Sequence, residues 1–137
     1  MMKRTFLRRL RLAIVLIGLP VMFDASAKSQ ERTQIAVDVA FVGDDGLSQR
    51  FQSAVEKAIT RRMNLRLATG QDVADISVRS ESNVDWDKVG GREVAIYRVL
   101  IKKRGWSHEI DKLGVCYSDR MEKCGTDIAT VLWKLTR

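Results

Sequence analysis

The stretch QIAVDVAFVGDDGLSQRFQSAVEKAITRRM, residues 34–63, carries two clear structural signals, one after the other. Its first part alternates between apolar and mixed positions, which predicts a β-strand. The apolar face of that strand comprises Ile35, Val37, Val39 and Phe41. Because the other face is also partly apolar, we expect this strand to lie inside the sheet, with neighbours on both sides.

The second part of the stretch predicts an amphipathic helix of about four turns, because its apolar residues recur at intervals of three and four. These residues are Leu47, Phe51, Ala54, Val55, Ala58, Ile59 and Met63. Asp44 or Asp45 is the expected N-cap, since a carboxylate there accepts hydrogen bonds from the free amides of the first turn.

Shorter apolar patterns follow along the chain. Leu65 and Leu67 indicate a short strand, a second begins at Ile76, residues 93–102 form a strong one, and 106–117 form the last. The apolar phase shifts inside 106–117, which suggests a β-bulge. Residues 81–91, ESNVDWDKVGG, are expected to form a loop around Trp86.

A second helix ends the chain. Its apolar stripe runs from Met121 to Leu135, and Asp119 with Glu122 forms a loose capping box. Because Gly125 weakens the first turn, the firm part of this helix is expected at 126–135.

When the short strand at Leu65 and Leu67 is not counted, the predicted order is β-α-β-β-β-α, an α+β two-layer sandwich whose mixed, mostly antiparallel sheet carries both helices on one face. The helical crossover makes the first two strands parallel. This order resembles that of the small periplasmic α/β domain at the amino terminus of the TolB family. The resemblance rests on element order and assigns a role to no residue.

The N-terminal 27 residues have the pattern of a secretory signal peptide. Five basic residues precede an apolar run from Leu12 to Phe23, and Ala25-Ser26-Ala27 follows. Twelve apolar residues are fewer than the roughly 20 that span a bilayer. Cleavage after Ala27 is therefore favoured over an uncut anchor or a buried core helix. We expect residues 28–137 to form a single exported domain, periplasmic or secreted.

Net charge gives little support to a nucleic-acid partner. The chain has 24 basic and 17 acidic residues, but the predicted signal peptide takes five of the basic ones and Asp24. The remaining 19 basic and 16 acidic residues give residues 28–137 a net charge of only +3. The high isoelectric point thus owes much to the export signal rather than to a basic binding surface.

Cys116 and Cys124 are the only cysteines. Their spacing is not C-x-x-C, which disfavours thioredoxin-type redox chemistry. A zinc site would need more ligands, and only His108 could join the cysteines, with an acid such as Glu109 or Asp119. In an oxidising compartment a structural disulfide is favoured over two free thiols or a metal site. It would join the last strand to the start of the final helix.

Two groups of residues are candidates for contact with a partner. Asp85, Trp86 and Asp87 place an aromatic ring between two acids in the expected loop, although Trp86 could equally fold back on the sheet edge. Arg61, Arg62 and Arg66 cluster near the end of the first helix, either as a solvated helix end or as a site for an anionic partner.

No nucleotide-binding, serine-hydrolase or metalloprotease motif is present, and we expect no cofactor and no metal. An enzyme is therefore the less favoured class. The favoured hypothesis is a small exported binding or accessory protein that contacts a protein partner in the envelope or outside the cell. The alternatives are an inhibitor or immunity-type protein, a small cell-wall hydrolase using acidic residues, and an anion-binding protein.

Overall fold

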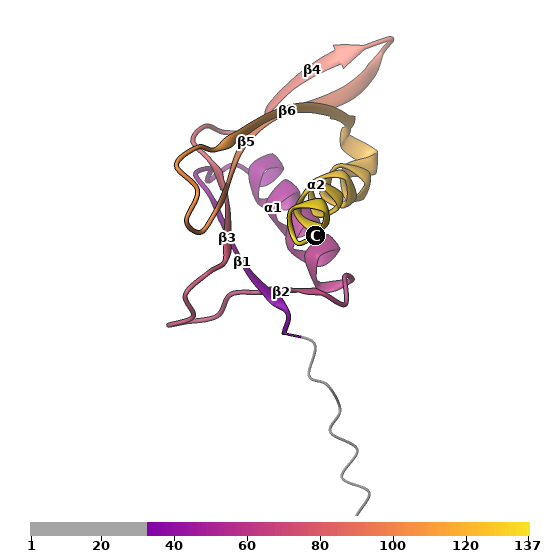
Figure 1. The fold of residues 1–137 in the computed structure, drawn as a ribbon. Helices are drawn as coiled ribbons and strands as arrows, with labels where there is room; N and C mark the ends of the chain where they lie inside the picture. Colours follow the sequence, from indigo (N-terminus) through magenta and orange to yellow (C-terminus); the bar gives the residue numbers. More distant parts are fainter. Residues whose placement is uncertain (1–32) are drawn as a thin grey trace, which may run out of the picture. The chain divides into compact units, whose positions relative to one another are not determined.

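The computed structural model describes residues 33–137, so the predicted signal peptide and its cleavage site at Ala27 lie outside the described residues. These residues form a curled mixed sheet and two helices (Figure 1). The strands are β1 (Ile35–Phe41), β2 (Leu65–Leu67), β3 (Ile76–Ser80), β4 (Asp85–Val89), β5 (Arg92–Lys103) and β6 (Ile110–Tyr117). The helices are α1 (Gly46–Thr60) and α2 (Met121–Leu135), and a single 3-10 turn, η1 (Ser118–Arg120), precedes α2.

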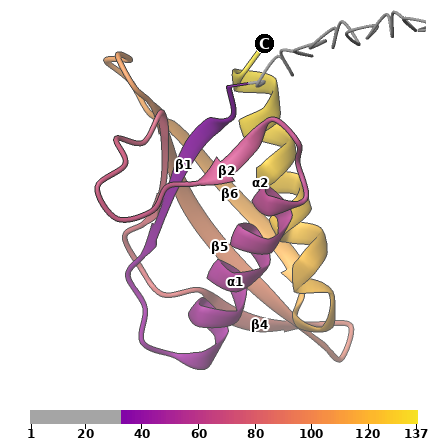
Figure 2. The ribbon, with the colours of Figure 1, turned by 90° about the horizontal axis from the view of Figure 1, so that it is seen from below.

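The two-layer α+β fold predicted from the sequence is confirmed. The strand order is β2-β1-β3-β5-β4, and β6 pairs with the other edge of β5. β1 is parallel to both β2 and β3, whereas β5 is antiparallel to β3, β4 and β6. Both helices cover the same face of this sheet (Figure 2). As predicted, β1 lies inside the sheet.

Asp45 is the N-cap of α1. One carboxylate oxygen of Asp45 accepts hydrogen bonds from the amides of Leu47 and Ser48, at 2.9 and 2.8 Å. Its other oxygen accepts the Ser48 hydroxyl at 2.6 Å. The hydrogen bonds from Ser48 hold the pKa of Asp45 below its usual value. The assignment of Met63 to the helical stripe was wrong, because α1 ends at Thr60 and the Met63 side chain is exposed.

The expected loop at 81–91 is instead part of a β-hairpin. β3 and β4 run along the same edge of β5, interrupted by residues 81–84. The buried Val84 holds the segment 81–84 against α1, since its amide donates a hydrogen bond to the hydroxyl of Ser48 in that helix. Gly90 and Gly91 form the turn to β5, both with positive φ, a conformation that a two-residue hairpin turn requires and that glycine adopts without strain.

The predicted bulge in the last strand is absent, because β5 and β6 keep one continuous antiparallel register from Val94–Tyr117 to Ile101–Ile110. The phase shift has another cause. Residues 110, 112, 114 and 116 of β6 face the helices, and the opposite row, which includes Leu113 and Val115, faces outward. The last strand is thus apolar on both faces.

The core lies between the sheet and the helices, where α1 and α2 pack closely. Gly125 does not weaken the first turn of α2 but permits this packing, and the helix begins at Met121. A Cβ atom on Gly125 would lie 3.0 Å from the Val55 nitrogen of α1, and closer still to the Ala54 carbonyl. The predicted capping box was also wrong, since no side chain caps α2 and Glu122 pairs with Lys57 instead.

Candidate interaction surface

The helix-free face of the sheet carries exposed apolar side chains along β6. Leu113 is 68% exposed and Val115 is 59% exposed, and Tyr117 lies in the same row. Across β5, Val94 is paired with Tyr117 and Ile96 with Val115, so both continue the apolar rows. We call this set the outer apolar surface: the exposed Leu113, Val115 and Tyr117, with the partly exposed Ile96 and the buried Val94 beside them. Soluble proteins rarely leave contiguous apolar surface uncovered unless something binds it.

Charged pairs border this surface. The Arg98 guanidinium contacts the Asp111 carboxylate at 2.5 Å, and its hydrogen bonds lower the pKa of Asp111. Arg92 lies over the ring of Tyr117, 3.8 Å from its centre, and pairs with Asp119 at 3.0 Å. The surface therefore has an apolar centre and a polar rim, an arrangement typical of protein–protein interfaces.

The strand geometry of β4 separates Trp86 from its two acidic neighbours. Asp85 is paired with Ile96 and Asp87 with Val94, so both carboxylates lie in the rows of the outer apolar surface. Trp86 is paired with Ala95 on the opposite face, and its side chain is 65% exposed. The acids and the aromatic ring therefore face opposite sides of the hairpin, and one ligand cannot be held between them.

The C-terminal end of α1 and the strand β2 lie away from β4 (Figure 2). Arg61 and Arg62 directly follow α1, and Arg66 is on β2. Each is engaged by another side chain. Arg61 lies 3.7 Å from Glu122, and Arg62 donates to the Thr130 hydroxyl at 2.8 Å. Arg66 contacts Asp72 at 2.6 Å and lowers the pKa of that carboxyl. The cluster therefore helps to join α1 and β2 to neighbouring segments.

A disulfide joins Cys116 of β6 to Cys124 in the first turn of α2. It fixes the end of the last strand against the start of the last helix, where the chain reverses through η1. The outer apolar surface and the first turns of α2 are thereby held together covalently.

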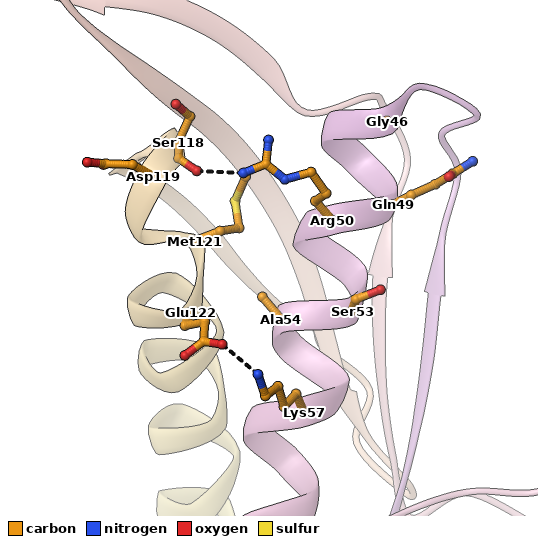
Figure 3. Close-up of a pocket in the computed structure, with 10 residues that line it drawn as sticks. All are labelled: Gly46, Gln49, Arg50, Ser53, Ala54, Lys57, Ser118, Asp119, Met121 and Glu122. Atoms are coloured by element: carbon orange, nitrogen blue, oxygen red, sulfur yellow. Dashed lines mark hydrogen bonds and ion pairs between the residues drawn. The ribbon is translucent and has the colours of Figure 1, made fainter.

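A hollow of about 780 Å³ is an open groove between the N-terminal halves of α1 and α2 (Figure 3). Its cations are engaged by the protein. Arg50 donates a hydrogen bond to the Ser118 carbonyl at 2.9 Å, and Lys57 contacts Glu122 at 2.6 Å, which lowers the pKa of Glu122. These contacts join α1 to η1 and α2, and both cations are thus already paired within the protein.

A second hollow, of about 360 Å³, lies where β6 turns into α2. Its apolar wall is part of the sheet, and its polar wall comes from η1 and α2. The lining residues are Val89, Val94, Val115, Cys116, Tyr117, Arg120, Lys123 and Asp127. This region was not among the sites predicted from the sequence. The only signal for it was the phase shift in 106–117, which reflected apolar residues on both faces of the strand.

Neither described helix has the length and apolar character to cross a membrane. No group of three or more potential metal-binding side chains occurs in residues 33–137.

No protein-family model matches the chain, and no curated protein does. Solved structures that are similar to part of the chain include the following two. A minor lipoprotein from Acinetobacter baumannii superimposes with a TM-score of 0.48 and 8% identity, over 71% of this chain and 91% of that one. A variant of PelC from Paraburkholderia phytofirmans, solved as a dodecamer, gives a TM-score of 0.43 and 15% identity, over 74% and 85% of the two chains.

Proposed function

We propose that this chain is a small exported protein that acts by binding another protein in the cell envelope or outside the cell. The observation that carries the proposal is the outer apolar surface on β5 and β6, which neither helix of residues 33–137 covers. Leu113 and Val115 are more than half exposed there. When a partner buries such side chains, the free energy of binding gains roughly 25 cal/mol per Å² of apolar area removed from water, which favours a protein partner.

Export is supported by two independent features. The N-terminal 27 residues have the basic, apolar and small-residue parts of a signal peptide. The Cys116–Cys124 disulfide is of a kind that persists mainly outside the reducing cytoplasm. The mass of the protein recovered from an expressing cell tests this part. We expect a chain that begins at Lys28, and a cytoplasmic chain that keeps residues 1–27 would contradict it.

Site-specific photo-cross-linking in living cells tests the binding function. A benzophenone amino acid at Leu113 is expected to give a discrete protein adduct. The same amino acid at Met63, which is also exposed and apolar but lies beyond α1, is the matched control. Equal labelling at both positions, or no protein adduct at Leu113, would refute a binding role for the outer apolar surface.

A further inference from the structure

β6 is an edge strand. One of its edges pairs with β5 along its whole length, and no strand of residues 33–137 pairs with its other edge. An edge of eight residues with exposed apolar side chains is a template for the addition of another strand. Natural proteins usually protect such an edge, so an uncovered edge is a candidate binding site for another strand.

Three cations lie next to this edge without ion pairs. Lys112 is on β6 itself, Arg120 ends η1 and Lys123 is in the first turn of α2. None of them forms a salt bridge with any residue at 33–137. Elsewhere on the sheet Arg79, Arg92 and Arg98 all have carboxylate partners. The charge at the β6 edge is therefore available to a partner.

The two kinds of side chain lie on different faces of the edge. The row of Leu113, Val115 and Tyr117 faces outward, whereas Lys112 belongs to the row that faces the helices, on the side of Lys123. A strand added to β6 would align its own alternate side chains with these two rows. Its outward positions would meet apolar groups and its helix-side positions would meet cations.

We propose that the free edge of β6 binds an extended segment of a partner protein in which apolar and acidic residues alternate. This inference rests on the proposed binding function and names its site and the chemistry of its partner. The added strand would gain backbone hydrogen bonds from β6. An apolar side chain would enter the hollow bordered by Val115 and Tyr117, and its acidic neighbours would pair with Arg120 and Lys123.

Charge argues against a second copy of this chain as the occupant. A symmetric pair of β6 strands would bring both sets of Lys112, Arg120 and Lys123 to one shared edge. Like charges opposite one another destabilise a pair of strands. Asp127 is the one acid among the residues that line the hollow beside Arg120 and Lys123, so the two copies of Asp127 cannot balance six cations.

Fluorescence anisotropy with synthetic decapeptides tests the proposal on the purified protein. The probe alternates Val and Glu, a second peptide has the same composition with five Val followed by five Glu, and a third alternates Val and Lys. The protein variant combines Arg120→Glu with Lys123→Glu. Acidic residues suit the N-terminal end of α2, so this variant is expected to fold, which circular dichroism checks. The matched control is Lys134→Glu, on the same helix and exposed.

We expect saturable binding of the alternating Val/Glu peptide and binding about tenfold or more weaker for the other two peptides. The double variant should lose about tenfold in affinity, because two ion pairs of roughly 0.7 kcal/mol together correspond to that factor. Lys134→Glu should stay within about twofold of the wild type.

The proposal is wrong if the alternating Val/Glu peptide does not bind, if the block peptide binds equally, or if the double variant binds like the wild type. Phosphatidylglycerol vesicles are a further arm. Charge-dependent vesicle binding without peptide binding would assign the edge to a lipid surface instead. A protein adduct at Leu113 in cells, together with no binding of the alternating Val/Glu peptide, would support the proposed binding function. It would refute only strand addition at the β6 edge.

Discussion

Gly125 gives a sharp test of how closely α1 and α2 pack. Helix propensity alone predicts that Gly125→Ala stabilises the protein by about 1 kcal/mol. The structure predicts the opposite sign, because the new Cβ would meet backbone atoms of Ala54 and Val55 that cannot rotate away. Overpacking of this kind costs about 1–3 kcal/mol. We therefore expect a net loss of up to about 2 kcal/mol, and a melting temperature lower by up to about 15 °C.

Thermal and urea unfolding followed by circular dichroism measure this difference. Gly46→Ala is the matched control, since Gly46 also lies in a helix but nothing is within 4 Å of the position its Cβ would take. The control should change the free energy of unfolding by less than about 0.5 kcal/mol. A Gly125→Ala protein as stable as the wild type, or more stable, would show that the helices do not approach each other as described.

Removing the disulfide by Cys116→Ala with Cys124→Ala should lower the free energy of unfolding by about 2–3 kcal/mol, the loop-closure term for so short a loop; an unchanged urea midpoint would contradict this. Asp45→Ala should lower stability at neutral pH. Because the folded pKa of Asp45 is lowered from 3.8, its contribution is present above about pH 3.8 and is lost as the pH falls through the folded value. The difference in free energy of unfolding between Asp45→Ala and the wild type should therefore become smaller in acid. A difference that stays constant in urea titrations down to pH 2 would contradict the capping role. Gly91→Val should destabilise the hairpin, since Gly91 has a φ of 78°; proteolysis between β4 and β5 no faster than in the wild type would count against it.

The sequence predicted β1 and α1 well because their signals are local. The alternation of Val37 and Val39 and the spacing of Phe51 and Ile59 each reflect burial against one neighbouring layer. The same reasoning failed for β4. Its residues are exposed on both faces, so no apolar pattern marks it, and pairing with β5 is what makes it a strand. Gly90-Gly91 between two extended segments was the available signal for the hairpin.

The candidate surface was harder to predict, for a physical reason. Ile110 and Cys116 are apolar on one face of β6, and Leu113 and Val115 on the other. Only the topology decides which face the helices cover. The partners of the arginines are likewise invisible to local patterns, because Arg61 pairs with Glu122 on α2, far along the chain. Arg61, Arg62 and Arg66 therefore looked more available in the sequence than they are in the folded protein.

The central position of β1 has a consequence for how the chain folds during synthesis. The ribosome delivers β1 before either of its neighbours, β2 and β3, exists. The segment from β3 to β6 can pair largely through local hairpins, whereas β1 gains its second neighbour only when β3 arrives. Contacts of this kind slow folding and leave strand edges exposed meanwhile. The nascent chain thus carries β1 with an unpaired edge until residues 76–80 have been synthesised.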